Sequence, residues 1–277
     1  MTSEFLRNFE YIRITRYARI ASSTIIFYDH GITMSEEVEL FWKSKLSLVA
    51  VLFFANRYVV WGSILFDLYA VLSPNVTDVV SSVCTHYYQW ESWSLLLASM
   101  LAQAILQARV YALYMLNKKI LALMLVCYST CSIICAWLTW TELESLTIKA
   151  IPIPGGKYCT PSQSVNFFSF WIPVLIFDFL LFSLAVFRGL AELKSDGSGM
   201  LRDGTRSLFG IMVRDSVFYF LVLAAIYLTI ILFWLLAPVG LREAPVSFCP
   251  VLSCVLTNRV LFNLRKAIRE DSQTDSQ

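Results

Sequence analysis

Charged side chains inside long apolar runs are the residues of this sequence most suited to chemistry. Arg57 lies about twelve residues into an apolar segment, and Asp178 lies about as far into another, which places both near the middle of a membrane-length helix. An arginine at this depth costs roughly 2.5–3.5 kcal/mol on insertion scales, so it is normally buried against a partner. Two opposite charges at one depth predict a buried pair, which is either a ligand or ion site or a structural salt bridge.

A second group of charges lies nearer the predicted cytoplasmic side. Arg109 ends the third apolar segment, Arg214-Asp215 opens the sixth, and Arg259 lies toward the end of the last. Because these residues come from three helices and share a depth, they predict an ionic network that could hold the bundle in one of two packings. The alternative is that each arginine extends to the lipid headgroups.

Other reactive residue types are sparse or badly spaced for catalysis. His30 and His86 fall on opposite sides of the predicted membrane, which leaves too few ligands for a histidine-based zinc site. Cys127, Cys131 and Cys135 repeat every four residues, a spacing that favours helix packing over metal binding. Phosphate-loop, serine-hydrolase and zinc-protease motifs are absent from the sequence. We therefore expect no enzymatic activity and predict no catalytic, cofactor or metal site.

The composition indicates the elements that must position these charges. The chain is 57% hydrophobic and 15% charged, whereas soluble domains carry about 25% charged residues. The net charge of +2 is too small to indicate a nucleic-acid partner. These values predict an all-α integral membrane protein with the lipid bilayer as its surroundings. The predicted spans are 11–28, 45–68, 90–114, 119–140, 167–187, 207–236 and 245–264.

The first predicted span is the least apolar. Arg13, Arg16 and Arg19 occupy its first half, where we expect them to reach for the lipid headgroups; without this span the count is six. A short loop is predicted to follow it, and that loop contains Asp29, Glu36, Glu37 and Glu39. The residues 142–166 are predicted to form an ordered loop on the other side, and the tail 270–277 is predicted to be disordered.

The distribution of Lys and Arg predicts the orientation. The outer loops hold only Lys149, Lys157 and Arg242, so the positive-inside rule places the N-terminus outside and the C-terminus inside. Asn75 then lies in an outer sequon, and the outer cysteines Cys84 and Cys159 are a candidate disulfide. We expect the plasma membrane or another membrane of the secretory pathway.

One pattern in the region 20–60 resembles a known family. The residues that carry it are Tyr28, Asp29, Thr33, Glu37, Val38, Trp42, Asn56, Arg57 and Tyr58. The pattern is similar to the N-terminal signature of a fungal family of multi-pass membrane proteins, found in mushroom-forming fungi and without an established activity. The resemblance implies a bundle of seven membrane helices.

Three kinds of function fit these expectations. The first is a receptor-like seven-helix sensor with a small-molecule ligand and a cytoplasmic signalling partner, a hypothesis that rests on layout alone. The second is a small-molecule or ion transporter that uses Arg57 and Asp178 as contacts at mid-depth. The third is a structural membrane protein without a ligand.

Overall fold

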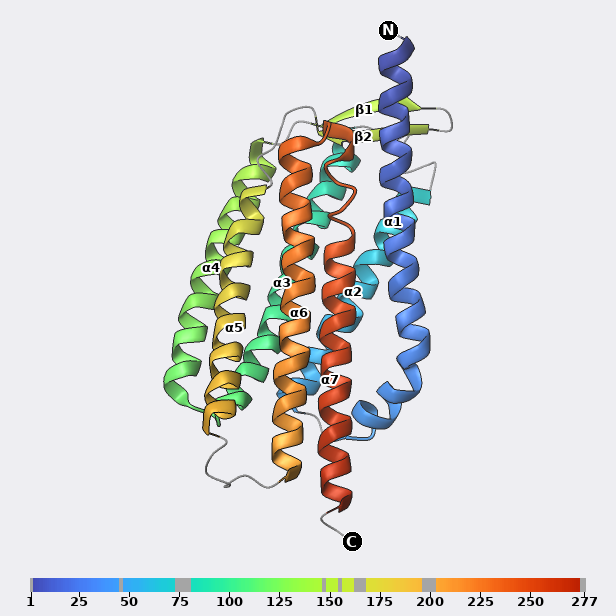
Figure 1. The fold of residues 1–277 in the computed structure, drawn as a ribbon. Coiled ribbons are helices and arrows are strands. Elements are labelled where there is room, and N and C mark those ends of the chain that lie inside the picture. The colour runs from blue at the N-terminus through green and yellow to red at the C-terminus, as the bar shows by residue number, and fades with distance from the viewer. Residues whose placement is uncertain are drawn as a thin grey trace.

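The apolar segments fold into long helices, because only a helix satisfies every backbone polar group of a segment surrounded by lipid. The computed structural model of the chain describes residues 2–44, 47–72, 81–145, 148–153, 156–161, 168–195 and 203–274. Within them the main helices are α1 (Thr2–Glu37), α2 (Leu48–Leu72), α3 (Ser81–Leu113), α4 (Lys118–Ser145), α5 (Phe168–Ser195), α6 (Asp203–Leu236) and α7 (Phe248–Thr274). The start of α1 and the end of α7 lie at opposite ends of the bundle (Figure 1).

Five of these helices, α2 to α6, are long and apolar enough to cross a membrane. They indicate an integral membrane protein. Among the described residues, α1 and α7 do not meet the same criterion, because each carries a row of charged side chains. Whether α1 and α7 also cross the membrane therefore depends on whether their charged side chains are paired inside the bundle.

The structure differs from the sequence-based expectation at three places. The predicted loop with Asp29, Glu36 and Glu37 is helical, since α1 continues to Glu37 and a π-helical turn, η1 (Val38–Trp42), follows it. The tail predicted to be disordered is helical as far as Thr274. The all-α prediction also misses a β-hairpin within 142–166.

The hairpin consists of β1 (Ile148–Ile153) and β2 (Gly156–Pro161). The strands are antiparallel, with register from Ile148 opposite Pro161 to Ile153 opposite Gly156. A two-stranded sheet tolerates its prolines because each strand keeps one edge without a partner. The hairpin lies at the end of the bundle where α1 begins (Figure 1), and β1 packs against α3.

The largest core lies among α3 to α7. Trp171 and Leu181 of α5, and Leu223 and Ile230 of α6, are among its fully buried side chains. The other side of the bundle is formed by α1, α2 and α7, where α1 packs against both α2 and α7. Polar side chains concentrate on this side, as described next.

Candidate functional site

Arg57 of α2 lies in a group of polar side chains near the C-terminal end of α1, here called the inner cluster (Asp29, Thr33, Glu37, Trp42, Asn56, Arg57, Tyr58, Asn258 and Arg259). Trp42, Tyr58 and Arg259 are exposed at its edge, and the other members are buried. Arg57 Nε lies 2.8 Å from Glu37 Oε2, and the two side chains are 3% and 0% exposed. Arg57 Nη2 also donates a hydrogen bond to Thr33 Oγ1 at 2.8 Å. The charge of Arg57 is thus balanced by α1.

Glu37 accepts two further hydrogen bonds. Its Oε1 accepts from the Tyr58 hydroxyl at 2.8 Å and from the Trp42 indole nitrogen at 3.0 Å. The wide turn of η1 returns Trp42 to the carboxylate five residues before it, and single π-helical turns of this kind are frequent at functional sites. Five of the residues that carry the family resemblance therefore meet at one buried ion pair: Glu37 and Arg57 form it, and Thr33, Trp42 and Tyr58 hydrogen-bond to it.

Aromatic rings surround that ion pair. The Arg57 guanidinium carbon lies 5.8 Å from the ring centroids of Phe53 and Phe262. Phe41 stacks on Phe53 with centroids 3.8 Å apart. These rings shield the pair from water, which strengthens its electrostatic attraction.

The predicted pair of Arg57 and Asp178 is not formed, because Arg57 is paired with Glu37. Asp178, on α5, is buried at 4% exposure, and its Oδ1 accepts a hydrogen bond from Gln103 Nε2 of α3 at 3.0 Å. The expectation was wrong because equal depth in the membrane does not place two residues on facing helices.

A regular series of ion pairs joins α1 and η1 to α7. Asp29 Oδ1 lies 2.9 Å from Arg259 Nε, Glu36 Oε1 lies 2.6 Å from Lys266 Nζ, and Glu39 Oε1 lies 2.6 Å from Arg269 Nη1. In every pair the partners are 230 residues apart. A constant offset shows that the two helices run parallel and in register, and we call this series the α1–α7 ladder.

The other predicted residues are distributed as follows. Asn56 Nδ2 donates to Asn258 Oδ1 at 3.4 Å, which joins α2 to α7. Tyr28 is 68% exposed. Arg109 is buried, at 4% exposure. Arg259 pairs with Asp29 of α1. The side chains of Arg214, Asp215, Cys84 and Cys159, and the whole of Asn75, lie outside the described residues.

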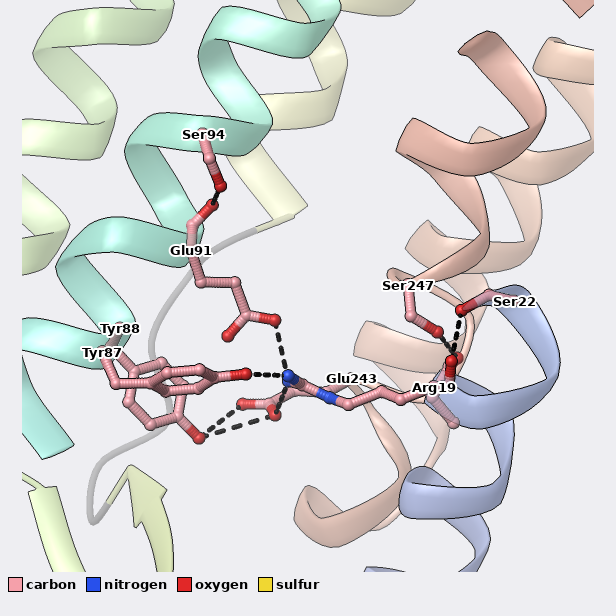
Figure 2. Close-up of polar contacts among 9 residues, drawn as sticks. Arg19, Ser22, Tyr87, Tyr88, Glu91, Ser94, Glu243 and Ser247 are labelled. Carbon is pink, nitrogen blue, oxygen red and sulfur yellow. Dashed lines mark hydrogen bonds and ion pairs between the residues drawn. The ribbon is translucent and has the colours of Figure 1, made fainter. Parts of the chain in front are cut away.

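A second polar group lies toward the N-terminal end of α1, here called the outer cluster (Arg19, Asp67, Tyr87, Tyr88, Glu91 and Glu243). Arg19 Nη2 lies 2.7 Å from Glu91 Oε1 and 3.4 Å from Glu243 Oε2. Figure 2 shows the guanidinium of Arg19 reaching from α1 toward Tyr87 and Glu91 of α3. Arg19 thus turns into the bundle, where the sequence predicted contact with headgroups.

Glu243 precedes α7, and its surroundings shift the pKa of its carboxyl. Tyr88 Oη donates to Glu243 Oε1 at 3.1 Å, and the Glu243 side chain is 20% exposed. Burial and the neighbouring Glu91 carboxylate raise the pKa of Glu243 to about 7, against the opposing effect of Arg19. The outer cluster therefore has a carboxyl that titrates near neutral pH.

A cavity of about 50 Å³ opens beside the outer cluster. Arg19, Asp67 and Glu91 line it together with serines that include Ser22 and Ser247, which Figure 2 shows at the α1 side. A volume of roughly 10–15 Å³ holds one water, so this cavity has room for several waters or a small polar group.

An apolar layer separates the cavity from the inner cluster. It consists of Ile26, Val60, Ile64, Ala98, Val251, Cys254 and Val255, all buried, from α1, α2, α3 and α7. Val60, Ile64 and Ala98 also form part of the cavity wall. Within the described residues, the two polar clusters on α1 are therefore divided by packed hydrophobic side chains.

The spacing of charged residues in the sequence is a signal for the α1–α7 ladder. Asp29, Glu36 and Glu39 are spaced by seven and then three residues, and Arg259, Lys266 and Arg269 repeat the same spacing with the opposite charge. Positions seven apart share a helix face. The matched spacing predicts two helices in parallel register, whereas no comparable pattern marks the partners of Arg19 or the Gln103 contact of Asp178.

One part of the chain, in the α1–α2 region, is similar to a known family. Residues 17–62 match the model of a family of unknown function (DUF6533). The match covers most of α1, all of η1 and the first part of α2, and so includes Arg19, Arg57 and Glu37. No curated protein matches the chain in sequence.

Proposed function

We propose that the chain is a seven-span membrane protein, with the N-terminus outside and the C-terminus in the cytoplasm, that acts as a receptor-like sensor. The charges of α1 and α7 support seven spans. Arg19, Asp29 and Glu37 are buried against partners on other helices rather than facing the lipid. Charges inside a membrane bundle are tolerated when they pair within it.

The orientation is supported by the positions of the basic side chains. Lys266 and Arg269 lie at the C-terminal end of α7, and Lys118 and Lys119 lie at the start of α4. These ends share one side of the bundle, which the positive-inside rule makes cytoplasmic. We place the protein in the plasma membrane or another membrane of the secretory pathway.

The observation that supports sensing is the division of α1 into two polar regions by an apolar layer. The cavity at the outer cluster has room for a small polar group, and the packed apolar layer next to it opposes passage through the bundle. Both regions involve α1 and the chain around α7, so binding outside can shift the α1–α7 ladder inside. A ligand moves such an equilibrium only by its difference in affinity for the two packings.

The test uses the full chain in nanodiscs with a fluorophore at Lys43→Cys, an exposed position after η1. The probes are a panel of small primary amines and amino acids added from the outer side. Sensing predicts that at least one probe changes the fluorescence and that Glu91→Gln, in the wall of the cavity, abolishes the change. Glu144→Gln, at an exposed carboxyl near the end of α4, is the matched control and leaves the change intact.

The result that would overturn the proposal comes from the same protein in sealed vesicles. Uptake of an active probe that is lost in Glu91→Gln would make the protein a transporter, because it would require a route through the apolar layer. A response at Lys43 without uptake supports the sensor.

A further inference from the structure

A second cavity lies between α5 and α6, apart from both polar clusters. Its volume is about 200 Å³, and it is lined by Leu175, Asp178, Phe179, Phe182, Phe220, Leu221, Ala224 and Tyr227. Phe179 and Leu221 at its rim are 66% and 60% exposed on the outside of the bundle. Both belong to helices apolar enough to cross a membrane, so the cavity opens toward lipid.

Asp178 is the feature that distinguishes this cavity from an ordinary gap between helices. Oδ1 accepts the hydrogen bond from Gln103 Nε2, and the carboxyl, whose Oδ2 is buried, also interacts with the Tyr227 hydroxyl. Asp178 is thus the charged residue of a lining that is otherwise apolar apart from the Tyr227 hydroxyl, and none of the ion pairs among the described side chains neutralises it.

The depth of Asp178 identifies the kind of donor. It lies near the middle of the span Phe168–Ala191, where a carboxylate without a counter-ion is costly. A cation on an apolar body would compensate its charge and also cover the exposed rings of the rim. The cavity is smaller than a typical drug site, so it would hold the head of such a molecule while its chain stays in the bilayer.

We propose that the cavity between α5 and α6 binds a lipophilic amine dissolved in the membrane, with its ammonium group on Asp178 and its apolar chain between Phe179 and Leu221. The site is independent of the outer cluster, and its occupant arrives from the lipid. A membrane-dissolved alcohol would offer a hydrogen bond without the charge, and it serves as the discriminating comparison.

The experiment uses the full chain in nanodiscs and an alkylamine with a photoreactive diazirine in its chain. The matched probe is the alcohol of equal length. The proposal predicts saturable labelling of peptides from α5 and α6 by the amine, competed by unlabelled amine, and labelling at least about tenfold weaker by the alcohol, since tenfold in affinity corresponds to the loss of one modest polar interaction.

Variants make the test specific to the cavity. Asp178→Asn removes the charge with little change in shape, and Leu221→Trp fills the rim from an exposed position, so both should reduce amine labelling at least about tenfold. Leu228→Trp, exposed on the same helix but outside the cavity lining, is the control and should label normally. Unchanged amine labelling in Asp178→Asn would overturn the proposal. Equal labelling of the wild type by amine and alcohol would also overturn it, because the site would then select a hydroxyl lipid.

Discussion

Asp29 on α1 and Arg259 on α7 form an ion pair, Oδ1 to Nε 2.9 Å, that begins a ladder of pairs with one sequence offset. Asp29 is 5% exposed at its side chain, whereas Arg259 is 52% exposed. The pair therefore lies at the border between the buried inner cluster and the more exposed pairs beyond it. It fixes how α1, which is less apolar than the membrane-length helices α2 to α6, is aligned with the rest of the bundle.

The register of the ladder is open to a charge-reversal test. Glu36→Lys places like charges opposite Lys266 and should lower the free energy of unfolding by up to about 1 kcal/mol, the range of exposed ion pairs. Adding Lys266→Glu should restore the loss. Adding Arg269→Glu instead should not, because it leaves Lys266 facing a lysine. Thermal unfolding in detergent compares the stability of the single variant and the two double variants. Rescue by Arg269→Glu would show that the helices pair in another register.

Breaking the buried pair of Arg57 and Glu37 should be far more damaging. Arg57→Met leaves the Glu37 charge buried without its partner, a change that typically costs about 3–5 kcal/mol. The double variant Arg57→Met with Glu37→Gln removes both charges and should recover part of the loss. Arg269→Met, at a pair whose side chains are 50% and 57% exposed, is the control and should cost about 1 kcal/mol or less. Similar losses for the two single variants, by chemical denaturation, would contradict the buried geometry.

The contact between α1 and the 3-10 turn η3 (Val239–Leu241) depends on a glycine. A Cβ added at Gly240 would lie 3.0 Å from Tyr11 Cβ, and Thr15 Oγ1 donates to the Gly240 carbonyl at 3.0 Å. Gly240→Ala should therefore lower the free energy of unfolding by about 1–3 kcal/mol, the usual range for overpacking. Gly62→Ala in α2, where nothing lies within 4 Å of the added Cβ, should instead stabilise the helix by roughly 0.5–1 kcal/mol. A neutral Gly240→Ala in thermal unfolding would show that η3 is not held against α1.

The raised pKa of Glu243 predicts how stability depends on pH. Between its ordinary value of 4.5 and about 7, the folded protein binds a proton that the unfolded chain has released. This contribution to stability is therefore greatest below pH 4.5 and is lost as the pH rises to about 7, with a slope of at most about 1.4 kcal/mol per pH unit. Glu243→Gln should flatten the slope in thermal melts across this range, and Glu144→Gln should leave it unchanged. An identical slope in Glu243→Gln would assign the proton to another group.

The sequence predicts the helices of this protein better than their contacts. Runs of apolar residues locate α2 to α6, because membrane length and hydrophobicity alone mark them. Charge density suggested a loop at Glu36 and Glu37, but those side chains have partners on α2 and α7, which keeps α1 helical to Glu37. The pairing of Arg57 with Glu37 could not be predicted for the same reason, because a glutamate in a predicted loop is not expected to be a buried counter-ion. The outer cluster joins residues distant in sequence, such as Arg19 and Glu243, and only the packing of the helices brings them together.

The central claim is that α1 crosses the membrane as one helix of the bundle, with its charges paired inside. The most direct measurement is the accessibility of an epitope tag at each terminus in intact and in permeabilised cells. The account predicts that antibodies reach the N-terminal tag in intact cells and the C-terminal tag only after permeabilisation. Both tags on the same side would contradict it, because α1 would then not span the membrane and the pairing of Arg57 with Glu37 would need another explanation.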